Sequence, residues 1–195
     1  MPELRSPISL ICLVSACSLV AGDQSGLKPT VEELRLIENP PSSVSFKVDA
    51  LTPKAIEWYE AVEKQLLPLG RSLTKEELQI AKRLGVDTPE EIRIVILSEF
   101  PMPSDSELLQ EAKRLGFDSD HVIGRTNGNV ILLKPSASSD MSVVTHELVH
   151  VRQIRKLGIR GFVRRYILEL ETVGYRRSPL ELEAYSTKRR LYPST

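Results

Sequence analysis

Residues 143–151 read VVTHELVHV, and this stretch determines how we interpret the rest of the chain. Valine and leucine occupy most of its positions, and Glu147 is the one charged residue between His146 and His150. An apolar segment of this kind predicts a buried helix. Residues i and i+4 lie on the same face of a helix, about one turn apart, so both histidines can reach a single ion.

Glu147 lies beside the two histidines, where a carboxylate can accept a proton from water at a metal ion. A catalytic zinc ion has three protein ligands and keeps a fourth position for water. The two cysteines, Cys12 and Cys17, lie near the N-terminus, so a metal site in the folded part must use histidines and carboxylates. The motif therefore predicts a zinc site that needs a third ligand.

An acidic segment after a proline break, residues 178–185 (SPLELEAY), predicts a helix that can supply this ligand. HELVH together with LELEAY resembles the gluzincin class of zinc metallopeptidases, in which a glutamate on a later helix completes the site. The resemblance covers roughly the last quarter of the chain and implies a zincin-like fold with Glu181 as the third ligand. Glu183 is the alternative, because a residue two positions along points to a different helix face. Tyr185 stands where membrane-bound members have a supporting aspartate.

Tyrosines near the motif are candidate catalytic groups. Peptide hydrolysis benefits from a hydrogen-bond donor to the developing oxyanion. Tyr175 and Tyr185 are our candidates for this role, and Tyr166 is also near the motif in sequence. Each of them can instead be a packed aromatic residue.

A strand before the motif is a candidate for substrate binding. An edge strand beside the active helix can pair with an extended peptide through main-chain hydrogen bonds. Val130, Ile131 and Leu132 lie about a dozen residues before His146, as that arrangement needs. The alternative is a core strand.

The remaining patterns predict an α+β fold: a small antiparallel sheet with a hairpin, packed by helices. Helices are expected over 53–67, 75–84 and 107–115, a strand over 92–97, and hairpin strands over 121–125 and 129–134. Asn127-Gly128 is a strong hairpin signal. Beyond Pro135 the pattern is helical, with breaks at Gly158, Gly174 and Pro179. Residues 77–87 and 108–118 are similar, which suggests two similar helices on the sheet.

The N-terminus predicts export. Residues 1–22 resemble a secretory signal, and Val-Ser-Ala-Cys at 14–17 resembles a lipoprotein signal in which Cys17 is lipidated. Cleavage near residue 21 is the alternative and would give a soluble exported protein. Residues 23–45 are expected to be a flexible tether, and residues 46–195 the metallopeptidase domain. From these signals we expect the protein to lie in the bacterial cell envelope, either in the periplasm or anchored to a membrane.

The net charge of the chain argues against one class of binding partner. The 26 basic and 26 acidic side chains give no net charge, which argues against a nucleic-acid partner. The expected function is hydrolysis of a peptide or protein substrate with Zn²⁺ as cofactor. Two alternatives stay open: a non-catalytic envelope binding protein with the same fold, and a zinc hydrolase of a non-peptide amide.

Overall fold

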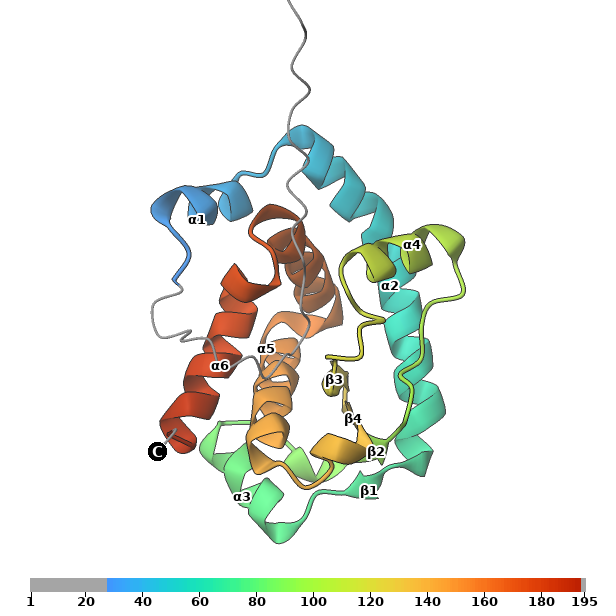
Figure 1. The fold of residues 1–195 in the computed structure, drawn as a ribbon, viewed down its shortest axis with the longest axis vertical. Coiled ribbons are helices and arrows are strands. Elements are labelled where there is room, and N and C mark those ends of the chain that lie inside the picture. Colours follow the sequence, from blue (N-terminus) through green and yellow to red (C-terminus); the bar gives the residue numbers. More distant parts are fainter. Residues whose placement is uncertain (1–27, 194–195) are drawn as a thin grey trace, which may run out of the picture.

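The computed structural model describes residues 28–193, and it confirms the α+β class (Figure 1). The helices are α1 (Val31–Glu38), α2 (Ser42–Leu66), α3 (Lys75–Arg83), α4 (Ser106–Arg114), α5 (Met141–Thr172) and α6 (Pro179–Leu191). The strands are β1 (Arg71–Ser72), β2 (Arg93–Ile96), β3 (Gly124–Asn127) and β4 (Val130–Leu133). Short 3-10 turns lie at Leu67–Leu69, Pro89–Glu91, Pro135–Ala137 and Tyr175–Arg177.

The four strands form one mixed sheet in the order β1-β2-β4-β3. The prediction of an antiparallel sheet is wrong for its central pair, because β2 and β4 run parallel. The residues of β4 explain its place. Val130–Leu133 is a continuous apolar run whose side chains are all buried, as in strands covered on both faces. The more polar β3 (GRTN) lies at the edge of the sheet.

The predicted hairpin is confirmed, but its loop is shifted by one residue and its first strand lies at 124–127 in place of 121–125. Asn127 pairs with Val130, so the two-residue loop is Gly128-Asn129. Gly128 has φ 62°, which favours glycine, and a Cβ there would lie 2.2 Å from the Glu63 carboxylate. That carboxylate accepts a hydrogen bond from the Asn129 amide at 2.7 Å. Helix α2 therefore fixes the turn, and with it the position of β3.

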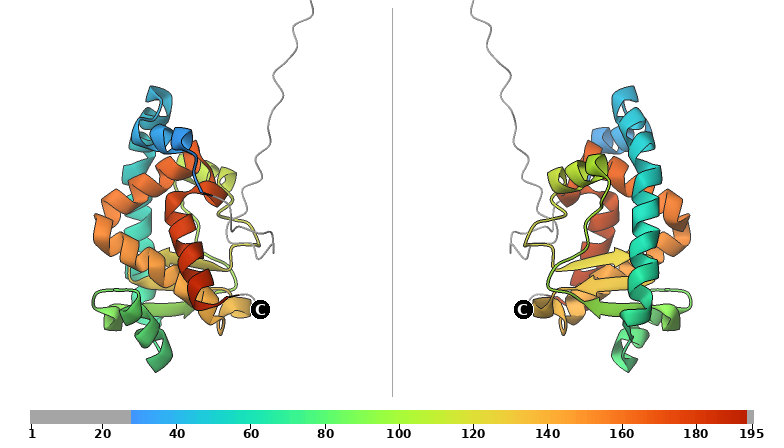
Figure 2. Two further views of the ribbon diagram at one scale, coloured as in Figure 1. Left: turned by 90° about the vertical axis from the view of Figure 1, so that its left-hand side faces the viewer. Right: turned by 90° about the vertical axis from the view of Figure 1, so that its right-hand side faces the viewer.

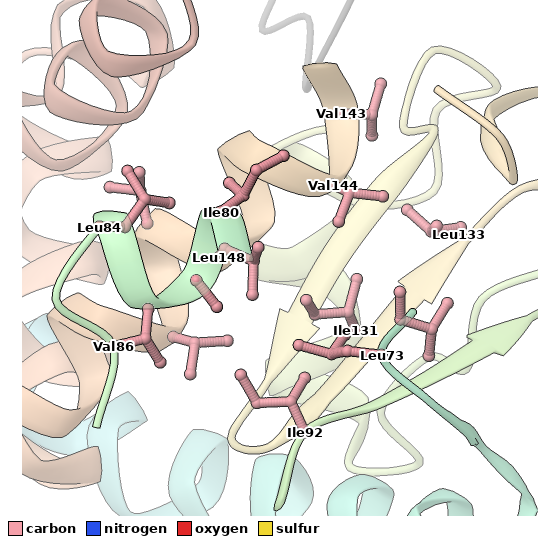
Figure 3. Close-up of a cluster of buried hydrophobic side chains, with 14 of the residues drawn as sticks. Leu73, Ile80, Leu84, Val86, Ile92, Ile131, Leu133, Val143, Val144 and Leu148 are labelled. Atoms are coloured by element: carbon pink, nitrogen blue, oxygen red, sulfur yellow. The ribbon is translucent and has the colours of Figure 1, made fainter. Parts of the chain in front are cut away.

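Helices cover both faces of the sheet. Ile131 and Leu133 pack with α3 and with the first turns of α5, including Val144 and Leu148 (Figure 3). The alternate residues of β4, Val130 and Leu132, pack against α2, which lies across the strands (Figure 2). The two similar segments form α3 and α4, and each helix is followed by a glycine with positive φ. The expectation that both pack on the sheet is wrong for α4, which packs with α2 and the second half of α5. The helix with the HELVH motif is thus held on the sheet by a continuous apolar core.

Helix α5 contains a break at Gly158, where φ is 71° and ψ is 159°. The helix changes direction there, and its second half, residues 159–172, continues toward α6 (Figure 1). Gly174 also has a positive φ, and α6 begins at Pro179. The three breaks predicted in this region are confirmed, and they allow α6 to return along α5.

The predicted tether over 23–45 is wrong where the structure describes it. Val31–Glu38 forms α1, capped by Thr30, and α2 already begins at Ser42. The expected helix start at Thr52 and Pro53 is also wrong, since α2 continues through both residues. Pro53 removes one backbone N–H, but α2 packs against α5 over its apolar face, which outweighs this loss.

The export predictions concern a different part of the chain. The predicted signal over residues 1–22 and the lipidation site Cys17 lie outside the described residues. None of the described helices has an apolar stretch long enough to cross a bilayer.

Candidate metal centre

His146 and His150 on α5 and Glu181 on α6 bring their donor atoms close together. Nε2 of His146 lies 3.0 Å from Nε2 of His150 and 3.2 Å from Oε2 of Glu181. Nε2 of His150 lies 3.4 Å from Oε1 of Glu181. All three residues are buried, with exposed fractions of 2%, 6% and 2%. The structure therefore assembles the three residues that the sequence predicts as ligands, in a group able to hold a metal ion.

The spacing of the donor atoms fits a tetrahedral ion. With ligand bonds of about 2.0–2.1 Å, neighbouring donors around such an ion lie about 3.3 Å apart. Nε2 of His146 lies 3.0 Å from Nε2 of His150 and 3.2 Å from Oε2 of Glu181, and Nε2 of His150 lies 3.4 Å from the other carboxylate oxygen, Oε1. Oε2 of Glu181 is buried and has no hydrogen-bond partner among residues 28–193. An ion would satisfy this oxygen and both histidine nitrogens together.

The ligand atoms are electrostatically coupled. Burial alone would lower the pKa of His150, but the charge and hydrogen bonding of Glu181 raise it to about 9. Burial alone would raise the pKa of Glu181, but the two histidines hold it well below its usual range. Without metal, the site therefore keeps a proton on the imidazole that faces the carboxylate.

Gln153, one turn after His150, fixes the orientation of that imidazole. Its amide oxygen lies 2.8 Å from Nδ1 of His150, and its amide nitrogen donates to the Leu180 carbonyl and to Glu183. Because the amide nitrogen donates to two acceptors, its oxygen must be the atom facing His150. Nδ1 therefore carries a proton, and Nε2 points to the metal position.

Glu183 is not among the three converging residues. Its carboxylate accepts hydrogen bonds from Arg152 at 2.6 Å and from Gln153 at 2.8 Å. Arg152 also donates to the Leu84 carbonyl at 3.0 Å. Glu183 thus supports the site through Gln153, and Arg152 holds Glu183 in place.

Glu147 is buried next to the two histidines and faces β3. The Thr126 hydroxyl donates to its Oε2 at 2.7 Å. A Cβ at Gly124 would lie 2.5 Å from its Oε1 and 3.0 Å from Val143. Glycine at position 124 is therefore required for the carboxylate to lie this close to the strand. Sequence reasoning missed both β3 residues, because their role depends on the packing of β3 against α5.

The tyrosines contact the site in different ways. The Tyr166 hydroxyl donates to Oε1 of Glu181 at 2.8 Å, and burial next to that charge raises the pKa of Tyr166. The ring of Tyr185 lies edge-on to His146, with centroids 4.6 Å apart. The hydroxyls of Tyr175 and Tyr185 lie 3.0 Å apart. Tyr166 therefore contacts a candidate ligand directly, although no sequence pattern marks it above the other two.

A fully buried glutamate, Glu169, attaches the start of α6 to α5. Its Oε2 accepts hydrogen bonds from the Ser178 hydroxyl at 2.6 Å and from the Leu180 amide at 2.9 Å. Ser178 in turn caps α6 by accepting from the Glu181 amide at 3.3 Å. These hydrogen bonds fix the start of α6 on α5 and so fix the position of Glu181 relative to the two histidines.

A pocket of about 70 Å³ is lined by the three candidate ligands and Glu147. Its lining includes Gly124, Arg125 and Thr126 of β3 and several aromatic residues. The expectation that residues 130–132 are an edge strand for substrate is wrong. Val130, Ile131 and Leu132 belong to β4, which has β2 on one side and β3 on the other, and their side chains are fully buried.

Comparison with known proteins gives no match: no family model, curated protein or solved structure is significantly similar to this chain. The gluzincin resemblance therefore stays a prediction from its motif residues. What the structure supports is narrower, namely a buried group of two histidines and one glutamate able to hold a metal ion.

Proposed function

We propose that this protein is a zinc-dependent hydrolase of peptide bonds. The observation that supports the proposal is the convergence of His146, His150 and Glu181 at 3.0–3.4 Å, with Glu147 on the same helix and one pocket open to all four. Two nitrogens and one carboxylate oxygen are a ligand set of catalytic zinc sites, which keep one position open.

Each residue of the site has a distinct role in the proposed hydrolysis. A zinc ion at this position would polarise a carbonyl group and lower the pKa of water toward ~7. Glu147 accepts a proton from water and delivers it to the leaving amine. The Thr126 hydroxyl orients the Glu147 carboxylate. Tyr166 holds one oxygen of Glu181, and Tyr175, which also lines the pocket, is a candidate donor to the developing oxyanion.

The substrate-binding strand in this proposal is β3, in place of residues 130–132. In an antiparallel pair, alternate residues direct their backbone groups to the partner strand. The Ile123 carbonyl accepts from Lys134 at 2.9 Å, so Gly124 and Thr126 direct theirs to the outer side of β3. The Tyr59 hydroxyl already donates to the Thr126 carbonyl. Gly124 is then the residue whose backbone is best placed to bind an extended peptide.

The test is metal content combined with turnover. We expect about one zinc ion per chain by mass spectrometry in the wild-type protein, and loss of zinc in His146→Ala. His121→Ala is the matched control, since His121 is exposed and far from the motif in sequence. Cleavage of a peptide library should depend on zinc and disappear in Glu147→Gln while the zinc remains. Equal zinc in wild type and His146→Ala would contradict the proposal.

The near-complete burial of the ligands favours a second candidate, a non-catalytic envelope binding protein with a structural metal. The same Glu147→Gln variant separates the two. A binding protein keeps its metal and its ligand affinity in that variant and shows no peptide cleavage in either form.

We also propose that the chain is exported and anchored through lipidated Cys17, on the basis of its N-terminal sequence. Mass spectrometry of the mature N-terminus tests this directly. A lipid-modified peptide beginning at Cys17 is expected, whereas an N-terminus near residue 22 would indicate a soluble exported protein.

A further inference from the structure

Arg125, in the edge strand β3, places a buried positive charge in the wall of the candidate active-site pocket. Its exposed fraction is 7%. Three aromatic rings surround the guanidinium, with centroids at 5.3 Å for Phe100 and Phe117 and at 5.8 Å for Trp58. These rings hold the group by cation–π contacts and exclude water from it.

The hydrogen bonds of Arg125 leave its charge without an anionic partner. Nη1 donates to the Pro101 carbonyl and Nη2 to the Phe117 carbonyl, both at 2.8 Å. Nε is buried and has no hydrogen-bond partner among residues 28–193. No carboxylate of these residues forms an ion pair with Arg125. Buried arginines are normally paired, because an uncompensated buried charge costs several kcal/mol.

The charge persists at neutral pH. Burial lowers the pKa of Arg125 to about 10, and the nearby Tyr166, Tyr59 and Glu147 oppose that effect. The guanidinium therefore stays protonated, and the two main-chain carbonyls fix its orientation.

The net charge of the pocket lining favours the binding of one anionic group once a metal ion is bound. Arg125, Glu147 and Glu181 are the charged side chains that line it, apart from the histidines, and they sum to −1. A divalent metal ion raises this sum to +1. A substrate with one negative group near Arg125 would bring the occupied pocket to neutrality, which is favourable where the dielectric constant is low.

We propose that Arg125 recognises a carboxylate group of the substrate and so determines specificity. This inference rests on the proposed peptidase function and names its substrate class: peptides that place one carboxylate in the pocket. The carboxylate can be a free C-terminus or the side chain of an aspartate or glutamate. A guanidinium that is oriented in advance and largely dry suits this group, since its donors match the carboxylate geometry.

The test measures binding in the zinc-loaded Glu147→Gln protein, so that it does not depend on turnover. The probes are N-acetylated heptapeptides of one sequence ending in a carboxylate or a carboxamide. A second set ends in carboxamide and carries Glu or Gln at each position in turn. By titration calorimetry we expect one carboxylate placement to bind at least 10-fold more tightly than its uncharged partner. The first set reports a C-terminal source and the second an acidic side chain.

Substitution identifies the residue responsible. Arg125→Gln should abolish the preference for the carboxylate, and Arg125→Lys should keep part of it. Arg93→Gln is the matched control, because Arg93 also lies in a strand and donates to main-chain carbonyls, but it does not line the pocket. Zinc content and thermal melting show whether each variant is folded.

A second readout needs no Arg125 variant. In isotope-labelled Glu147→Gln protein, the Nε–H resonance of Arg125 should shift with the tighter carboxylate peptide and stay in place with its uncharged partner. Equal affinity for all paired peptides, an unmoved resonance, or an unchanged preference in Arg125→Gln would overturn the inference. Absence of peptide cleavage by the wild type, with these binding differences intact, would instead contradict the proposed function.

Discussion

The amide oxygen of Gln153 lies 2.8 Å from Nδ1 of His150. This one contact determines which nitrogen of the imidazole can bind a metal ion, because the amide nitrogen of Gln153 is already committed to Leu180 and Glu183. The sequence HELVHVRQ therefore contains a ligand and, three residues later, the residue that orients it.

Replacing Gln153 should weaken metal binding without removing a ligand. In Gln153→Leu the His150 ring loses its acceptor at Nδ1, and zinc affinity should fall by about 10- to 100-fold. Competition with a chromophoric chelator measures this change. Gln110→Leu, an exposed glutamine on α4, is the control and should bind zinc as the wild type does. Identical affinities in both variants would show that Gln153 does not orient the ligand.

Metal binding should release a proton at neutral pH. The pKa of His150 is raised to about 9 in the metal-free site, so a metal ion must displace the proton from Nε2. Calorimetric titration of zinc at pH 7 in buffers of different ionisation enthalpy should give about one proton released per ion. Zinc affinity should rise with pH up to about 9, and no proton release would contradict the raised pKa.

The same raised pKa affects the stability of the metal-free protein. Its contribution is fully present below the unfolded-state value of about 6.5 and is lost as the pH rises through about 9. Zinc-free protein should therefore unfold at a lower urea concentration at pH 9.5 than at pH 6. His150→Gln should reduce this difference, and an unchanged pH dependence in that variant would assign the effect to other groups.

Gly124→Ala should impair catalysis while leaving the metal in place. The new Cβ would lie 2.5 Å from Oε1 of Glu147, so the carboxylate must move away from the strand. A displacement of about 1 Å in a catalytic group can lower the rate by about 10²-fold. Gly161→Ala is the control, because its Cβ meets Leu157 at an ordinary 3.5 Å. Peptide turnover and zinc content are compared for the two variants, and full activity in Gly124→Ala would exclude Glu147 as the base in its observed position.

A buried carboxylate on α3, Glu77, allows a test of the fold that is independent of the metal site. Burial raises the pKa of Glu77, but hydrogen bonds from Arg71 and the Thr74 amide outweigh it and lower the net value. Glu77→Gln should therefore cost about 1–3 kcal/mol at pH 7. The difference should shrink as the pH falls below the usual carboxyl value of 4.5. Urea unfolding of this variant is compared with exposed Glu76→Gln, and a loss independent of pH would contradict the assignment.

The sequence predicts the metal ligands well because their spacing is local. A helix places His146 and His150 on one face whatever surrounds it, and the acidic segment after Pro179 supplies Glu181. The parallel pairing of β2 and β4 could not be predicted this way. It follows from the burial of both faces of Val130–Leu133, which the periodicity of a four-residue run does not reveal.

The supporting residues were missed for a related reason. Gly124 and Thr126 act through contacts with Glu147, more than 20 residues further along the chain, and Tyr166, which the sequence marks only as near the motif, contacts Glu181 on the next helix. Their residue types are ordinary in strands and helices, so no local pattern marks them. The tether prediction is wrong because a segment rich in proline, serine and charge can still be helical when it packs on another element, as Val44 of α2 does against the cluster that includes α5.

Glu181 lies on a different helix from His146, so a bound ion would cross-link α5 and α6. It would close a loop of about 35 residues between α5 and α6. By the chain-entropy relation for cross-links, closing a loop of that length lowers the conformational entropy of the unfolded chain, which stabilises the fold by about 4 kcal/mol. Residues 28–193 contain no cysteine, so this ion would do for the folded part what a disulfide does in many exported proteins.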